Sequence, residues 1–169
     1  MEPQAQFERL YRQYANRVHA YALRRTTPSA ADDVVAEVFL VVWRRLHRVP
    51  EDPLPWLLGV ARKVLANRRR SESRAAALTE RLADPGSRPS APPVSPEVDN
   101  RVQRALAGLG ERDRELLLLI AWEGLRVNEA ATVLGVRSGT LAVRLHRARQ
   151  RLARALADED VEIEMEVQR

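Results

Sequence analysis

The chain has 169 residues and no cysteine, which allows one ordinary domain or two small ones and excludes disulfide bonds and thiolate metal sites. Its three histidines lie far apart, and it contains no run of about 18 apolar residues. We therefore expect no metal, no cofactor, no membrane insertion and a cytoplasmic location. The 28 basic residues outnumber the 23 acidic residues, and the net charge of +5 indicates nucleic acid as a partner.

The charge is unevenly distributed along the chain. Residues 1–83 carry 15 basic and 9 acidic residues, and residues 97–157 carry 11 and 7, whereas residues 158–169 carry 1 and 6. Five of the ten prolines fall within the neutral segment 84–96, which cannot continue a helix and predicts an extended linker. We therefore expect an all-α fold of two small helical domains, 1–83 and 97–157, joined by a Pro-rich linker and followed by an acidic tail.

Three helices are predicted in the first domain. Apolar residues recur with a period of 3.6 over roughly residues 3–25, and again from about Ser29, where Asp32 would complete a capping box. A third helix is expected after Asp52-Pro53, which resembles an N-cap followed by proline at the first helical position. The expected core residues are Phe7, Leu10, Tyr11, Tyr14, Val18, Tyr21 and Ala22, then Val35, Val38, Phe39, Val42 and Leu46, then Leu57, Val60, Ala61, Val64 and Leu65.

Two features of this domain go beyond core packing. The second helix is apolar on almost its whole circumference, and a domain of this size has little interior for Leu40 and Val41, so we expect a partner surface. Basic residues gather late in the third helix, over 62–74, where they would stabilise a helix C-terminus in any case. Alternatively, a basic track beside Trp56 and the loop 47–53 suits single-stranded nucleic acid. Trp56 is also compatible with simple core packing.

Four helices are predicted in the second domain. The first runs from Ser95-Pro96 to Gly110, and the second covers residues 111–123, with Leu116, Leu117, Ile120 and Ala121 inside and Gly124 as its end. A short helix, about 128–134, is broken by Gly135, and a long helix follows from Ser138 to about Ala157. The short helix, the glycine and the long helix together predict a helix-turn-helix.

The long helix has two contrasting faces. Leu141, Leu145, Ala148 and Leu152 form a core stripe, while residues 137–154 contain six arginines and no acid. We expect this helix to lie in a major groove, with flanking arginines on phosphates and N-terminal residues on base edges. A merely solvated basic face is the alternative. The expected contact residues are Arg137, Ser138, Thr140, Ala142, Val143, Arg144, His146, Arg147 and Arg149.

Three separated motifs, in order, resemble the extracytoplasmic-function (ECF) sigma factors of bacterial RNA polymerase. They are Asp33-Val-Val-Ala-Glu-Val-Phe-Leu-Val-Val-Trp-Arg44, Pro55-Trp-Leu-Leu-Gly-Val-Ala-Arg62, and Leu134-Gly-Val with Gly139-Thr-Leu and Arg144-Leu-His-Arg-Ala-Arg149. The resemblance covers about residues 5–156. It implies a sigma factor, not an enzyme, that binds core polymerase, directs it to specific promoters and assists promoter melting.

The resemblance also implies roles for individual residues. The first domain would be region 2, whose second helix docks on the coiled coil of the polymerase β′ subunit, and whose third helix holds the −10 element. The second domain would be region 4, which reads the −35 element and touches the β flap, and an anti-sigma factor would be the regulator. The implied polymerase contacts are Asp33, Ala36, Glu37, Leu40, Val41 and Arg44, and the implied −10 contacts are Trp56, Arg62, Lys63, Asn67, Arg68 and Arg69.

The chain departs from the family pattern at two places. The family often has glutamine where Ala36 stands, so one polar contact to the coiled coil is expected to be missing. Its recognition helix usually reads Gly-Thr-Val-Lys-Ser-Arg, whereas this chain has Ala142 and Val143 in place of the lysine and serine. These side chains donate no hydrogen bond but can pack on thymine methyl groups, which predicts a −35 preference based on apolar contacts, His146 and Arg147.

Two other functions are alternatives to a sigma factor. An ordinary helix-turn-helix regulator would dimerise and bind DNA tightly without polymerase, but it leaves the apolar second helix unexplained. An enzyme acting on nucleic acid lacks support, because the sequence has no metal-spaced carboxylates and no Gly-rich phosphate loop. The tail, 158–169, is expected to be a solvated extension, or else an autoinhibitory or partner-binding segment whose alternating apolar residues could add a strand.

Overall fold

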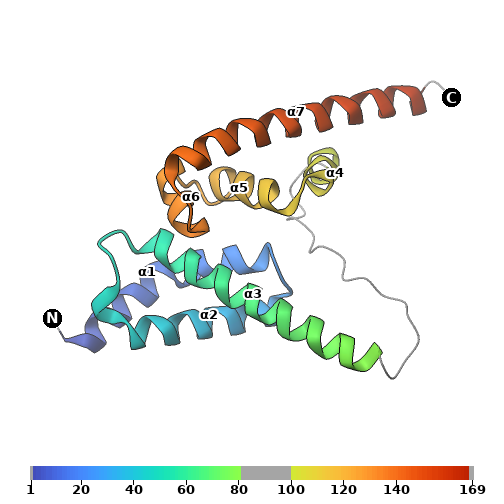
Figure 1. Ribbon diagram of the computed structural model, residues 1–169. Coiled ribbons are helices and arrows are strands. Elements are labelled where there is room, and N and C mark those ends of the chain that lie inside the picture. Colours follow the sequence, from blue (N-terminus) through green and yellow to red (C-terminus); the bar gives the residue numbers. More distant parts are fainter. Residues whose placement is uncertain (1, 81–99, 168–169) are drawn as a thin grey trace. The chain divides into compact units, whose positions relative to one another are not determined.

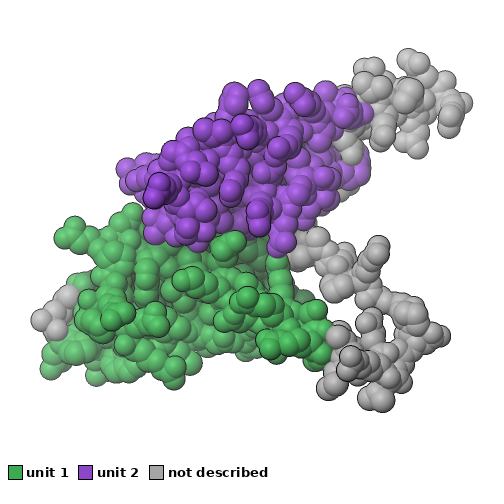
Figure 2. Space-filling view, in the orientation of Figure 1, with its two compact units in different colours: residues 1–93 green, residues 94–169 purple. Residues whose placement is uncertain are grey.

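The structure, a computed structural model, describes residues 2–80 and 100–167, with side chains described for 2–75 and 101–158. Within these residues the fold is all-helical, which confirms the expected fold class. The chain divides into two compact units, residues 1–93 and 94–169 (Figure 2). The predicted linker, 84–96, and the predicted helix start at Ser95 lie outside the described residues.

Unit 1 is a three-helix bundle. It contains α1 (Pro3–Leu23), α2 (Pro28–Arg44), a short 3₁₀ helix η1 (Leu46–Arg48) and α3 (Pro53–Glu80), and each α-helix packs against the other two (Figure 1). Burying a large aliphatic or aromatic side chain contributes about 1.5–3 kcal/mol, so a small set of residues accounts for most of the stability. The largest fully buried side chains of this unit are Val18, Tyr21, Val34, Val38, Val42, Leu57 and Leu58.

The start of α2 differs from the sequence prediction. The N-cap is Thr27, whose side chain accepts a hydrogen bond from the backbone N–H of Ala30 at 3.4 Å, and Pro28 occupies the first helical turn. Proline favours the first helical position, so the cap falls on the residue before it and the predicted capping box from Ser29 to Asp32 is wrong. Asp32 instead lies 3.0 Å from Nε2 of His19 on α1.

The third helix is longer than its C-terminal basic residues suggested. α3 continues to Glu80, and its last turns run past the ends of α1 and α2 (Figure 1). The effect of the helix dipole fades within the last turn, so it does not explain cations at 62–70. The dipole interpretation of these residues is therefore wrong, and the basic residues need another explanation.

Unit 2 is built around one long helix. It contains α4 (Asn100–Gly108), α5 (Glu111–Ala121), α6 (Val127–Leu134) and α7 (Ser138–Val167), and α7 packs against the other three (Figure 1). Gly135 ends α6 with a φ of +67°, a left-handed conformation that favours glycine. The predicted helix, glycine turn and second helix from Ser138 are confirmed, so α6 and α7 form the expected helix-turn-helix.

Two predictions within unit 2 are wrong. The expected inner positions Ile120 and Ala121 are half-buried and exposed, whereas the four consecutive leucines of 116–119 are all buried. Both α6 and α7 pack on α5, so α5 buries residues over a wider part of its circumference than the single helical stripe that we expected. The long helix also continues beyond Ala157 to Val167, because residues 157–167 contain neither glycine nor proline to end it. The tail is therefore helical through Val167, and its autoinhibitory or partner-binding role stays a prediction.

Candidate functional site

One face of α2 remains exposed although unit 1 has a complete core of its own. Asp33, Ala36, Leu40 and Arg44 are spaced by three, four and four residues, so they share one side of the helix, and all four are exposed. We call these residues the α2 face. Leu40 at its centre is 55% exposed, although Val38 and Val42, two residues away on either side, are fully buried. Two further predicted contact residues, Glu37 and Val41, are half-buried at its edge.

An aromatic cluster borders the α2 face on the side of α1. The ring of Phe7 lies edge-on to those of Phe39 and Trp43, at centroid distances of 6.0 and 5.3 Å, and Tyr11 lies 4.8 Å from Phe39. Tyr11 and Trp43 are each about half exposed, at 46% and 50%, so the placement of Tyr11 in the core is wrong. Sequence reasoning missed Trp43, although its position three residues after Leu40 places it beside that residue.

Arg68 of α3 borders the α2 face on the opposite side. Its Nε and Nη2 donate to Oε1 of Glu37 at 2.9 and 2.6 Å, and its Nη1 donates to Oδ2 of Asp33 at 3.3 Å. These hydrogen bonds, chiefly the one to Glu37, raise the pKa of the Arg68 guanidinium above its ordinary value. The side chain is only 29% exposed. The structure therefore joins one residue predicted to contact DNA with two predicted to contact polymerase.

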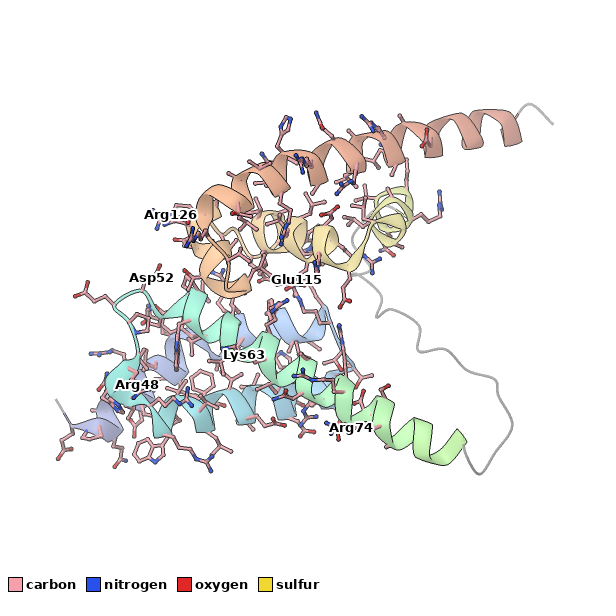
Figure 3. All side chains as sticks on the ribbon, in the orientation of Figure 1. Arg48, Asp52, Lys63, Arg74, Glu115 and Arg126 are labelled. Carbon is pink, nitrogen blue, oxygen red and sulfur yellow. The ribbon has the colours of Figure 1, made fainter. Side chains whose placement is uncertain are left out.

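Five exposed basic residues and one asparagine of α3, within residues 62–74, form a second candidate surface, which we call the basic track. Lys63 and Arg74 mark its extent along the helix in Figure 3. Within it, Nη2 of Arg70 donates to Oδ1 of Asn67 at 2.6 Å. Trp56, in the first turns of the same helix, is half-buried, which is compatible with both interpretations of this residue. The exposed members of the track are Arg62, Lys63, Asn67, Arg69, Arg70 and Arg74.

The first half of α7 has a buried apolar side and an exposed basic side, as the sequence predicted. Leu141, Leu145 and Ala148 are buried, which turns the opposite side of the helix to solvent. Val143 is 54% exposed, and Arg144 is half-buried at the edge. We call the exposed predicted contacts on and just before this helix the recognition face: Arg137, Ser138, Thr140, Ala142, Val143, His146, Arg147 and Arg149.

Comparison with known proteins identifies the family. The Sigma-70 region 2 family model matches residues 10–75, and the Sigma-70 region 4 model matches residues 99–152. The ECF RNA polymerase sigma factor SigL of Mycobacterium tuberculosis is 32% identical over 146 residues, covering 82% of this chain and 82% of SigL. The chain belongs to the ECF RNA polymerase sigma factors. The first match contains the α2 face and the basic track, and the second contains the recognition face.

Two other matches show how much of each protein the similarity covers. The probable RNA polymerase sigma factor RfaY of Xanthomonas campestris is 33% identical over 144 residues, which is 79% of this chain but only 36% of RfaY. The chain thus spans about a third of that relative's length. The solved structure of CnrH in complex with the cytosolic domain of CnrY is 28% identical, covers 93% of this chain and 90% of CnrH, and has a TM-score of 0.59.

Two arginines in region 4 of this sigma factor are used within the unit. Nε of Arg114 on α5 donates to the carbonyl of Leu106 at 2.8 Å, and its Nη2 donates to those of Ala107 and Leu109 at 2.7 and 2.9 Å. The carbonyl of Leu106 also accepts from the backbone N–H of Leu109 at 3.2 Å, and Arg114 adds side-chain hydrogen bonds at this C-terminal end of α4, so it serves as a cap. Arg151 of α7 pairs with Asp113 of α5. Arg151 therefore anchors α7 on α5, away from the recognition face.

No helix in the described ranges combines the length and the apolar character that a bilayer span requires. The described residues also contain no group of three or more histidine, aspartate or glutamate side chains arranged to hold a metal ion. Among the described residues, the candidate binding surfaces are the α2 face with its borders and the basic surfaces of α3 and α7. Which of their side chains contact polymerase or DNA stays a prediction.

Proposed function

We propose that this ECF sigma factor binds core RNA polymerase through the α2 face and directs it to specific promoters. The observation that carries the proposal is the exposure of Leu40 beside the half-exposed rings of Tyr11 and Trp43. A contiguous apolar patch with a polar rim is typical of a protein-binding surface. Asp33 and Arg44 supply charges of both signs at the rim, and the docking element we propose for it is the coiled coil of β′.

We propose that unit 1 also binds the −10 element, through the basic track and Trp56. Opening about ten base pairs costs on the order of 14 kcal/mol at roughly 1.4 kcal/mol per step. Stacking on an aromatic side chain returns about 1–3 kcal/mol per base. Trp56 alone cannot supply the difference, so this chain assists melting only as part of the polymerase and does not melt promoters when free.

We propose that unit 2 reads the −35 element with the recognition face and touches the β flap. Arg147 and Arg149 lie where they can reach phosphates, while Ala142 and Val143 present methyl groups. One helix-turn-helix module buries only about 600–1,000 Å², so the free chain binds DNA weakly. We further propose the domain boundaries 1–83 and 97–157, with 84–96 as the linker between them.

We infer that an anti-sigma factor regulates this chain and that it acts in the cytoplasm, where RNA polymerase works. CnrH, which it resembles in sequence and fold, was solved in complex with the cytosolic domain of CnrY. The α2 face is the surface that such a regulator gains most by covering, because that would block polymerase. We propose no catalytic role for the chain, in keeping with its family.

Co-elution with purified core polymerase on gel filtration in moderate salt tests the proposal. The wild-type chain should form a stoichiometric complex, and Leu40→Asp should abolish it, because a carboxylate at the centre of an apolar contact must be desolvated without a partner. The matched control is Leu23→Asp, the same change at an exposed leucine at the end of α1. Failure of the wild type to bind core, with tight binding of duplex DNA by the free chain, would instead establish an ordinary helix-turn-helix regulator.

A further inference from the structure

We propose that Arg68 is a positioning residue for polymerase binding, which holds the carboxylates of α2 in place and leaves DNA contact to its neighbours on the basic track. The proposal rests on the proposed function of the α2 face. It reassigns a residue that the family resemblance implied to be a contact to the −10 element.

The geometry of the contact separates Arg68 from its neighbours. Three of its nitrogens donate to α2, two of them to one Glu37 oxygen and the third to Asp33. The neighbouring members of the basic track are exposed, whereas Arg68 is only 29% exposed. To reach a phosphate, Arg68 would have to give up these three hydrogen bonds. A track neighbour such as Arg62 would give up no contact to α2, so it is the better phosphate ligand.

The contact also orders the polymerase-facing side of α2. Asp33 and Glu37 are one helical turn apart, and two carboxylates at this spacing repel each other. The guanidinium lies against both and offsets that repulsion. Each carboxylate keeps part of its surface in solvent, with Asp33 62% and Glu37 46% exposed. Arg68 therefore presents two fixed, still accessible acceptors beside Leu40, suited to basic side chains on a partner helix.

A lysine cannot reproduce this arrangement. The guanidinium is a planar fork that donates to two acceptor groups at once, whereas an ammonium is a single compact charge. Arg68→Lys keeps the charge that a phosphate contact needs, but loses the bridge between the two carboxylates. The two interpretations of Arg68 therefore differ in what Arg68→Lys does to polymerase binding.

The experiment compares full-length Arg68→Gln, Arg68→Lys and the track variant Arg62→Gln. Affinity for core polymerase and the salt dependence of binding to a promoter fragment are measured for each. We expect both Arg68 variants to bind core at least threefold more weakly, with an unchanged slope of log affinity for DNA against log salt. Arg62→Gln should retain core affinity and reduce that slope by about 0.7–0.9, as loss of one phosphate contact does.

The opposite pattern overturns the proposal. If Arg68→Gln lowers the DNA slope as Arg62→Gln does and leaves core affinity unchanged, Arg68 is a phosphate contact. A double-mutant cycle of Arg68→Gln with Glu37→Gln separates loss of this contact from simple unfolding. If the two residues act together, the losses of core affinity in the single variants should not add in the double variant. Additive losses contradict the proposal. If wild type does not bind core at all, the proposed function fails, and the DNA slopes of the free chain still decide the role of Arg68.

Discussion

At the scale of single residues, the recognition face combines arginines with an uncommon apolar centre. Val143 is 54% exposed, on the side of α7 opposite the buried Leu141, Leu145 and Ala148. Its side chain offers no hydrogen bond, so it cannot read a base edge by donation or acceptance. It can distinguish thymine from the other bases through the C5-methyl group, which lies in the major groove. The specificity proposed for this sigma factor therefore rests partly on methyl contacts.

Val143→Ala should change promoter selectivity more than overall DNA affinity. The substitution removes two methyl groups, each worth about 0.8 kcal/mol when buried against a partner, so preference for the optimal −35 sequence should fall about tenfold. Competition transcription between promoters that differ only in the −35 element measures this. Replacing the thymines of that element by deoxyuridine removes the same methyl contacts, so it should cost wild type more than the variant. Equal promoter preference in both proteins would disprove the methyl contact.

At the scale of helices, the ends that were predicted correctly are those marked by residues with special backbone requirements. Gly135 and Ser138 delimit α6 and α7 as expected. The errors have physical causes: Pro28 moves the cap of α2 to Thr27, and α7 passes its predicted end near Ala157 because no glycine or proline stops it. Local residue type thus predicts a helix boundary well where a capping residue, a proline or a glycine marks it, and poorly where none of these is present.

The candidate site, too, was only partly predictable from the sequence. Periodicity correctly separated the exposed Leu40 and Val143 from the core, because side-chain direction along a helix follows from spacing. It could not reveal that Arg68 reaches Glu37, since 31 residues separate them and the contact depends on how α3 packs on α2. Long flexible side chains near another helix are where sequence reasoning fails, because their partner is set by tertiary packing.

The N-terminus of α6 gives a pH-dependent prediction at this scale. Glu129 accepts from the backbone N–H of Arg126 at 2.6 Å and from its guanidinium, and these bonds, the side-chain bond first, lower the pKa of Glu129. A carboxyl group with a lowered pKa stabilises the fold above its ordinary pKa, and this contribution is lost as pH falls through the lower folded value.

Glu129→Ala should therefore destabilise α6 at neutral pH by about 1 kcal/mol, the size of a helix cap, and by less in acid. Amide hydrogen exchange of α6 in the full chain, followed from neutral pH down through the titration of the carboxylate, measures the difference. Glu129→Gln is the matched control, which keeps an acceptor oxygen but cannot ionise, so it should remove the pH dependence and keep part of the stability. A loss that is the same at every pH would contradict the role of the charge.

At the scale of the whole chain, function depends on how charge is divided between the two predicted domains and the tail. Residues 1–83 and 97–157 carry net charges of +6 and +4, but residues 158–169 carry six acidic residues and one basic residue, and most of this segment continues α7. The same helix therefore begins with a basic recognition face and ends in an acidic segment. Within about a Debye length, such a segment repels DNA that the basic part attracts.

Deletion of residues 158–169 should tighten binding of the full chain to promoter DNA at low salt. The deletion raises the net charge from +5 to +10, since it removes six negative charges and one positive charge. The gain should be several-fold near 50 mM salt and should narrow by about 200 mM, because counterions screen the repulsion. The control keeps the length and replaces the six acidic residues by their amides. If the amide variant binds DNA as tightly as the deletion variant, the charge of the tail is the cause. If only the deletion tightens DNA binding, the tail acts by occupying a surface of the chain. If neither variant changes DNA affinity at any salt concentration, both roles are ruled out.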